Sequence, residues 1–189
     1  MSRAHTSLHS AAIGSSGGYT LVELLVTLGV ASVLIGLAAP AFNQLVRQRA
    51  LSAHINDLAV AVAYARSEAI RRGAVVTLEA QAPTIGNEWG GGYCVVESSP
   101  LSVVGAACAP ADPARLLRVV APIPDVTLAG TGALSGVTRI GFSGRGLPLQ
   151  PLAGGITLCS DDNSVDPGRR LDLATTGRAV VGDHACHGS

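Results

Sequence analysis

The chain has 189 residues, which is enough for one globular domain with an appendage. Its 13 basic residues, all of them arginine, balance 13 acidic residues, and this neutral charge argues against a basic protein that coats nucleic acid. The sequence contains no nucleophile-elbow, Walker, dinucleotide-binding or zinc-protease pattern, so we predict a protein that is not an enzyme and needs no cofactor.

Residues 1–18 are mostly small and polar, and we interpret them as a leader peptide. A secretory signal peptide is cut after its apolar segment. Here the polar leader ends where the apolar segment begins, so a cut between Gly18 and Tyr19 would keep that segment on the mature chain. The cut would also create a new amine at the tip of the segment.

Residues 19–46 are predicted to form an apolar helix in which Glu23 is the only charged side chain. The stretch from Tyr19 to Ala39 would extend about 31 Å, close to the thickness of the hydrocarbon layer of a bilayer. We therefore expect this first half of the helix to be transmembrane. Pro40 is expected to kink it.

Glu23 is the candidate assembly residue. A carboxylate near a helix N-terminus is stabilised by the helix dipole, but in lipid it still needs a partner. The predicted partner is the new amine of Tyr19, on the same chain or, preferably, on a neighbouring subunit, where the pair would set the register of assembly. The alternative is a glutamate that lies among lipid headgroups without a specific partner.

The helix is predicted to continue as an amphipathic helix that ends near Gly73, since glycine suits the left-handed residue after a helix. Arg71 and Arg72 suit the negative end of the helix dipole. Together with Arg66 and Glu68 they are expected to form ion pairs on a solvated helix face rather than a binding site. The predicted apolar stripe consists of Leu51, Ile55, Leu58, Val62, Ala65 and Ala69.

From Ala74 the hydrophobic period changes to two, and Gly and Pro separate the apolar runs, as in short antiparallel strands. We predict an α+β fold in which a long, protruding N-terminal helix packs through its amphipathic half on a C-terminal antiparallel β-sheet domain. The pattern leaves open whether there is one sheet or two. The candidate strands are Val75–Ala80, Gly92–Glu97, Leu116–Val120, Val126–Ala129, Thr138–Phe142, Ile156–Cys159, Arg170–Leu173 and Ala179–Val181.

Four cysteines, Cys94, Cys108, Cys159 and Cys186, all follow the apolar helix and would share one side of a membrane. They form no CxxC pair and have no His at ligand spacing, so we expect no zinc site. An even number in an exported domain indicates two disulfides, with three possible connectivities. The two sequence-local closures, Cys94–Cys108 and Cys159–Cys186, are favoured, and buried free thiols are the alternative.

The acidic segment 161–168 has too few spaced oxygen ligands for an EF-hand loop. We expect an Asx-rich turn between two strands, which the loop of a Cys159–Cys186 disulfide would close. The sequence therefore predicts no metal site.

Two motifs carry a family resemblance. The sequence Gly18-Tyr19-Thr20-Leu21-Val22-Glu23 resembles the prepilin signal, in which the family usually has Phe at the position of Tyr19. The resemblance implies that prepilin peptidase cuts after Gly18 and that Tyr19 is then N-methylated. The segment Tyr64-Ala-Arg-Ser-Glu-Ala-Ile-Arg-Arg-Gly73, followed by Trp89 and Gly92-Tyr93, resembles the GspH/FimT family of minor pseudopilins and minor pilins.

This resemblance implies a structural minor subunit of a type II secretion pseudopilus or a type IV pilus. Residues 19–46 would be the transmembrane and filament-core helix, and residues 47–189 a pilin-like head in the periplasm of a bacterium, held by a single pass in the inner membrane. The implied partners are other pilins or pseudopilins, the prepilin peptidase and the inner-membrane assembly platform. The alternative is a simple membrane-anchored periplasmic domain.

A DNA-binding minor pilin is a further alternative. Some FimT-type minor pilins bind DNA through a C-terminal Gly-Arg-x-Arg segment, and Gly177-Arg178-Ala179-Val180 keeps only the first arginine. Arg169 and Arg170 lie nearby in the sequence, but aspartates surround them. Because phosphate binding needs several unopposed cations, this interpretation is weakened.

Overall fold

The structure is a computed structural model that describes residues 18–98, 108, 112–162 and 165–186, apart from the side chains at positions 37 and 39–41. The predicted leader falls almost entirely on residues 1–17, outside this part of the chain. The chain divides into two units, Met1–Ala41 and Phe42–Ser189. The second unit is called the head from here on.

Helix α1 (Leu21–Arg72) begins two residues later than predicted, because Thr20 caps it. The Thr20 Oγ1 accepts a hydrogen bond of 3.2 Å from the backbone N–H of Glu23, one of the N–H groups that a helix start leaves unpaired. The helix continues through position 40, so Pro40 does not end it, and the predicted kink stays a prediction.

The sequence predicts a transmembrane segment at residues 19–46. Within the described residues, no helix combines the length and the apolar character needed to cross a membrane.

The end of α1 confirms the prediction for Gly73. This residue has a left-handed backbone with φ of 62°. Its N–H donates to the Ile70 carbonyl and the Ala74 N–H donates to the Ala69 carbonyl, both at 3.3 Å. This pair of bonds is the Schellman motif, which satisfies the last carbonyls of a helix and turns the chain back toward the first strand.

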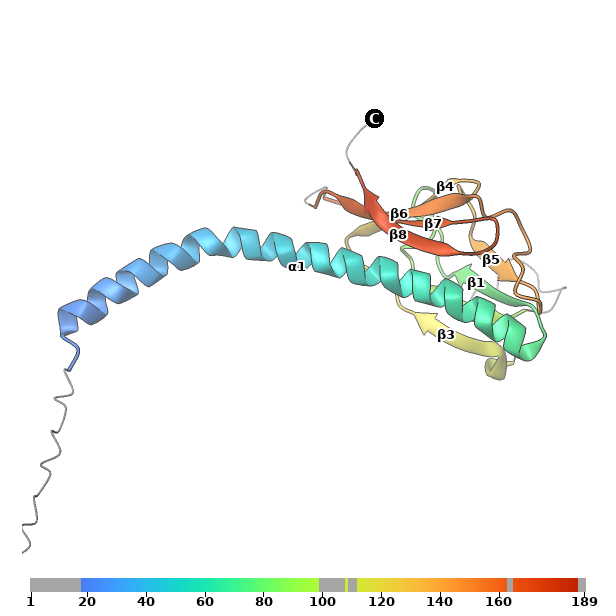
Figure 1. Ribbon diagram of the computed structural model, residues 1–189, viewed down its shortest axis with the longest axis horizontal. Helices are drawn as coiled ribbons and strands as arrows, with labels where there is room; N and C mark the ends of the chain where they lie inside the picture. The colour runs from blue at the N-terminus through green and yellow to red at the C-terminus, as the bar shows by residue number, and fades with distance from the viewer. Residues whose placement is uncertain (1–17, 99–107, 109–111, 163–164, 187–189) are drawn as a thin grey trace, which may run out of the picture. The chain divides into compact units, whose positions relative to one another are not determined.

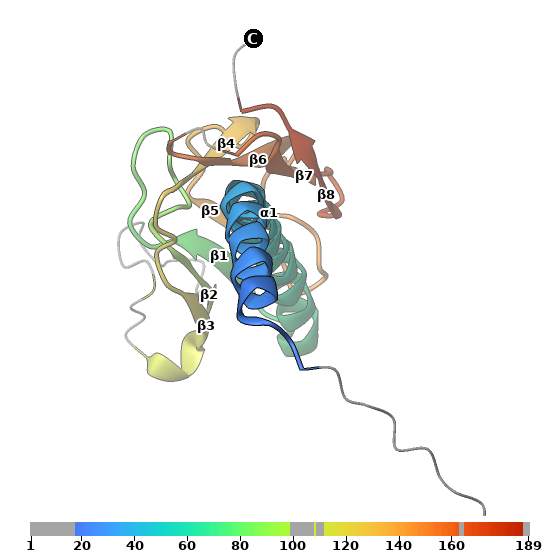
Figure 2. The same cartoon turned by 90° about the vertical axis from the view of Figure 1, so that its left-hand side faces the viewer.

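Among the described residues, eight strands follow α1, and they confirm the predicted strands in number and order. They pair antiparallel in two four-stranded sheets, in the orders β3-β2-β1-β5 and β4-β6-β7-β8. Figures 1 and 2 show the two sheets on different sides of the C-terminal half of α1. The strands are β1 (Val76–Ala80), β2 (Tyr93–Glu97), β3 (Leu116–Val120), β4 (Val126–Gly132), β5 (Arg139–Phe142), β6 (Gly154–Ser160), β7 (Gly168–Leu173) and β8 (Ala179–His184), and a short 3-10 helix, η1 (Pro113–Arg115), precedes β3.

One hydrophobic core joins α1 to both sheets. All six residues of the predicted apolar stripe are buried in it, which confirms the amphipathic half of the helix. From one sheet it contains Leu78, which lies opposite Ile140 in the register of β1 and β5. From the other it contains Ile156, which lies opposite Leu171. The helix is therefore the element that both sheets share.

The loop between β1 and β2 covers the open edge of β4. Strand β4 pairs only with β6, so its other edge presents free backbone groups. The Asn87 side chain fills part of this edge: its Oδ1 accepts from the Leu128 N–H at 2.8 Å and its Nδ2 donates to the Val126 carbonyl at 3.3 Å. The backbone N–H of Trp89 donates to the Leu128 carbonyl at 3.1 Å, and the Trp89 ring is fully buried. Through these hydrogen bonds, the loop between β1 and β2 of one sheet is fastened to β4 of the other.

Replacing Asn87 with Ala is expected to lower the free energy of unfolding by about 1–3 kcal/mol, because two backbone groups at the edge of β4 would lose their partner. Asn43→Ala, at an exposed position of α1, is the matched control and should change stability little. The measurement is urea unfolding of both variants. Equal midpoints for Asn87→Ala and the parent chain would show that water replaces these bonds without cost.

Candidate functional site

The predicted cleavage site lies directly ahead of α1. Gly18, Tyr19 and Thr20 are outside the helix and exposed, and Tyr19 keeps 82% of its surface accessible. Exposed, non-helical chain is the preferred substrate of proteolysis. Because Thr20 caps the helix, the peptide bond between Gly18 and Tyr19 lies outside it. The sequence analysis did not predict this cap, although Thr20 and Glu23 form the Thr-x-x-Glu signature of a capping box.

Glu23 lies in the first turn of α1 and is exposed. Its backbone N–H binds the Thr20 cap, while its carboxylate has no hydrogen bond or ion pair within the described residues. The N-terminus of a helix carries partial positive charge, which favours a carboxylate at this position. The negative charge is thus available to a cation from outside the helix.

The other end of α1 carries an ion-pair network around Glu68. Its carboxylate accepts from Arg71 Nε and Nη2 at 3.0 and 2.5 Å and from Arg72 Nε at 2.8 Å. The Nη1 of Arg72 also binds Glu97 Oε2 at 2.8 Å, so the network ties the helix end to the last residue of β2. Hydrogen bonds from Arg71 and then from Arg72 lower the pKa of Glu68 to about 2.

The prediction of a solvated ion-pair face is only partly right. Glu68 is buried, with 7% of its surface accessible, because it follows the buried Ala65 by three positions and lies on the same side of the helix. This spacing was visible in the sequence. Arg66, which was grouped with these residues, has no ion pair within the part of the chain that the structure describes, and it lies apart from the network.

The low pKa of Glu68 makes its contribution to stability depend on pH. A carboxylate with a depressed pKa in the folded state stabilises the fold above its unfolded pKa, near 4.5, and loses that contribution as the pH falls through about 2. Glu68→Gln is therefore expected to be less stable than the parent at neutral pH and equal to it below about pH 2. Thermal unfolding between pH 7 and pH 2 tests this. Asp57→Asn, at an exposed position of α1, is the control. If the stability difference between Glu68→Gln and the parent stayed constant down to about pH 2, the prediction would be contradicted.

The three arginines considered for DNA contact do not form a free cationic patch. Arg169 pairs with Asp183, and its Nε donates to Ser52 Oγ at 3.0 Å. Arg170 pairs with Asp172 at 2.6 Å. Arg178, at the turn between β7 and β8, is exposed and has no ion pair among the residues described. Two of the three positive charges are therefore neutralised within the sheet.

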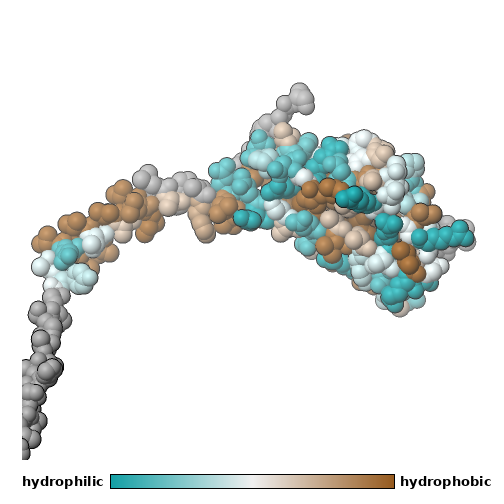
Figure 3. Space-filling view, in the orientation of Figure 1, coloured by the Kyte–Doolittle hydropathy of each residue, from teal (hydrophilic) through white to brown (hydrophobic). Residues whose placement is uncertain are grey.

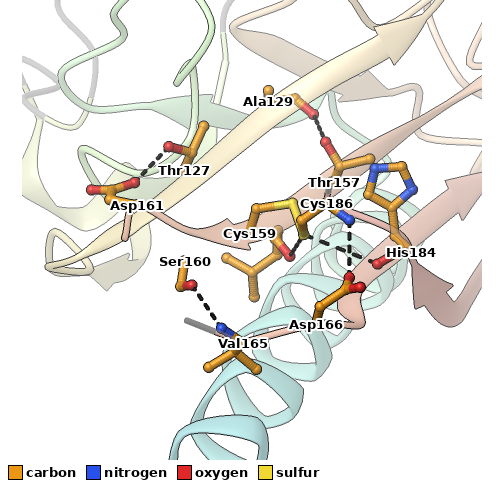
Figure 4. Close-up of a disulfide and its surroundings, with 11 residues drawn as sticks. Thr127, Ala129, Thr157, Cys159, Ser160, Asp161, Val165, Asp166, His184 and Cys186 are labelled. Carbon is orange, nitrogen blue, oxygen red and sulfur yellow. Dashed lines mark hydrogen bonds between the residues drawn. A yellow bond between two sulfur atoms is a disulfide. The ribbon is translucent and has the colours of Figure 1, made fainter. Parts of the chain in front are cut away.

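The acidic segment between β6 and β7 also distributes its charges among separate partners. Asp161 accepts from Thr127 Oγ1 at 2.6 Å, Asp162 pairs with Arg47 at 2.8 Å, and Asp166 accepts from the Cys186 N–H at 3.2 Å. Figure 4 shows Asp161 directed to Thr127 of β4 and Asp166 directed to Cys186, beyond the end of β8. Residues 163 and 164 lie outside the described part of the chain. Within that part, no group of three or more potential ligands could hold a metal ion.

Both disulfides have the sequence-local pairing that the sequence analysis favours. Cys94 in β2 binds Cys108, with Cα atoms 5.5 Å apart, and Cys159 in β6 binds Cys186, with Cα atoms 5.8 Å apart. Figure 4 shows the second bond fastening the chain beyond β8 to β6. Gly168 makes this close approach possible, because a Cβ there would lie 2.3 Å from Cys186 Sγ.

Comparison with known proteins decides the family. The family of type II transport protein GspH matches residues 54–177, from the amphipathic half of α1 to the turn before β8. The chain belongs to the GspH family. Its members are minor pilins and pseudopilins, a class of structural proteins that are generally non-enzymatic.

A curated relative and two solved structures are also similar to this chain. The GspH-family chain is 43% identical over 76 residues to the pilin-like protein PilA1 of Thermus thermophilus, and the match covers 40% of this chain and 44% of that protein. The chain therefore matches less than half the length of this curated relative. Crystal structures of the type IV minor pilin FimU of Pseudomonas aeruginosa superpose with TM-scores of 0.55 and 0.50, at 19% and 20% identity. The first covers 75% of this chain and 98% of FimU, and it shows that the fold is the α+β pilin fold.

Proposed function

We propose that this chain is a structural minor subunit of a type IV pilus or a type II secretion pseudopilus, assembled after prepilin peptidase cuts between Gly18 and Tyr19. The observation that carries the proposal is the start of α1. On a chain whose head belongs to the GspH family, the helix begins at Leu21, capped by Thr20, with an exposed peptide bond immediately ahead of it.

The proposed sequence of events uses residues at this end of the chain. Before the cut, the apolar helix of residues 19–46 is held in the inner membrane with the head, residues 47–189, in the periplasm. The peptidase exposes the amine of Tyr19, which is then N-methylated, and the assembly platform moves the subunit into the filament. Glu23 pairs there with the N-terminal amine of a neighbouring subunit, and Pro40 bends the helix in the filament core.

The competing role of a DNA receptor has little support in the head. Affinity for DNA depends on several cations that can displace counterions from phosphates. The salt bridges of Arg169 and Arg170 remove two of the three candidate cations, and Arg178 alone is a weak phosphate site.

Mass spectrometry of the protein isolated from its own bacterium tests the proposal. The expected product begins at an N-methylated Tyr19, lacks residues 1–18, and is present in the filament fraction sheared from the cells. A strain without prepilin peptidase is the control and should contain only the uncut chain in its membranes. Recovery of the uncut chain alone from cells with an active peptidase would overturn the proposal and favour a simple membrane-anchored domain.

A further inference from the structure

The surface of the head has an apolar groove. One wall is the outer face of α1, with Ala59, Val60, Ala63 and Ile70, and the other is the turn between β7 and β8 with the start of β8. The groove has a volume of about 640 Å³. Val60 and Ile70 keep 53% and 54% of their surface exposed, although most large apolar residues of the amphipathic half of α1 are buried. Figure 3 shows apolar surface open to solvent on the head.

Two arginines, Arg66 and Arg178, line this groove from opposite walls. Neither has an ion pair or a side-chain hydrogen bond within the described residues, whereas Arg72, Arg139 and Arg169 are all paired with carboxylates. No carboxylate is among the residues that line the groove. Its charge is therefore complementary to an occupant that brings acidic groups to an apolar surface.

The shape of the groove fits a helix. Its α1 wall runs from Asn56 to Ile70, which is about 21 Å, or four turns, along the axis. Ala59 and Ala63 are one turn apart, and small side chains at this spacing let a second helix approach closely. A groove that takes the apolar face of an amphipathic helix is a common mode of recognition. A nucleic acid backbone would instead require a surface rich in unpaired cations.

A second copy of this chain is a poor occupant. Between Phe42 and Arg72 its helix contains only two acidic residues, Asp57 and Glu68. Glu68 is buried and bound by Arg71 and Arg72, so it is not available to another subunit. Asp57 is exposed, so the helix of a second copy offers a single carboxylate to a groove that has two arginines unpaired within the described residues. A helix with two or more exposed carboxylates must come from a different chain.

We infer that this groove binds an acidic amphipathic helix of a different pilin-type subunit, its neighbour in the filament. The inference rests on the proposed function, since it needs the chain to be assembled. The two arginines would pair with carboxylates at the edges of the incoming helix, and Ala59, Val60, Ala63 and Ile70 would contact its apolar face. The head would thereby select which subunit lies next to it.

Photocrosslinking in the native bacterium tests the inference with the full chain. A photoreactive amino acid is placed at Ala63, in the groove, and at Ala114, in η1, as a matched exposed control. The Ala63 position is expected to crosslink to an acid-bearing helical peptide of another prepilin-type protein, identified by mass spectrometry, and the Ala114 position is not. Arg66→Glu or Arg178→Glu should reduce the crosslink roughly tenfold or more, because like charges would then meet. Arg115→Glu, outside the groove, should not.

A charge reversal in the partner completes the test. When the crosslinked carboxylate of the partner is changed to Arg, the crosslink from position 63 should be restored in the chain that carries Arg178→Glu. A crosslink to DNA, to lipid or to a second copy of this chain would overturn the inference, and so would no crosslink from a chain that is present in the filament fraction. Absence of the trimmed chain from that fraction would overturn the proposed function, and the inference with it.

Discussion

The Glu23→Ala variant is expected to keep the start of α1 and the fold of the head but to be lost from the assembled filament. The Thr20 cap uses the backbone N–H of residue 23, which alanine retains. The head core begins at Leu51, far along the chain from the substitution. What the variant loses is the one negative charge of the apolar segment, which in the proposed assembly pairs with the N-terminal amine of a neighbour.

The expected loss is large because the proposed pair would be buried in the filament core. Truncating one partner of a buried charge pair costs roughly 2 kcal/mol or more, equivalent to about a 30-fold loss in association constant. The measurement is the ratio of this protein in sheared filaments to that in the membrane fraction. Glu23→Gln should fail like Glu23→Ala, since it keeps the shape and removes the charge, and Glu23→Asp should retain part of the incorporation.

Thr20→Val is the matched control for helix structure. It removes the cap at a cost of about 1 kcal/mol but keeps the carboxylate, so most incorporation should remain. If Thr20→Val and Glu23→Ala failed equally, the helix start rather than the charge would explain the loss. Normal incorporation of Glu23→Ala would end the proposed role of Glu23.

The local pattern of the sequence was sufficient for most of the fold. The stripe from Leu51 to Ala69 predicted the buried face of α1, because a helix must bury its apolar side. Gly73 predicted its end, since few other residues adopt a left-handed backbone. The alternation after Ala74 predicted the strands but not their division into two sheets, which depends on pairing between distant segments such as β1 with β5.

The candidate site shows a sharper limit of sequence reasoning. Charges that looked alike in the sequence differ in their surroundings: Arg169 and Arg170 form ion pairs, and Arg178 forms none with the residues that the structure describes. The groove joins residues near position 63 to residues near position 178, and no local pattern predicts that contact. The role of Asn87 was missed for the same reason, because its partners in β4 lie about 40 residues further along the chain.

Removing the Cys159–Cys186 disulfide by a double serine substitution is expected to lower the free energy of unfolding by about 3–4 kcal/mol. The bond closes a loop with a sequence separation of 27 residues, which includes β7 and β8. Cross-linking restricts the unfolded chain, and the effect grows with the length of the loop. The Cys94–Cys108 bond closes a shorter loop, with a separation of 14 residues, and its removal should cost about 3 kcal/mol.

The order of these two losses distinguishes two physical causes. If restriction of the unfolded chain dominates, the Cys159–Cys186 pair contributes more. If packing of the sulfur atoms dominates, the order reverses, since Cys94 is fully buried in β2 whereas Cys159 is half-buried. Urea unfolding of both double-serine variants measures the order, and the reduced parent chain is the control in which no side chain is replaced. A variant as stable as the oxidised parent would contradict the prediction for that bond, because an unfolded chain freed of a cross-link must gain entropy.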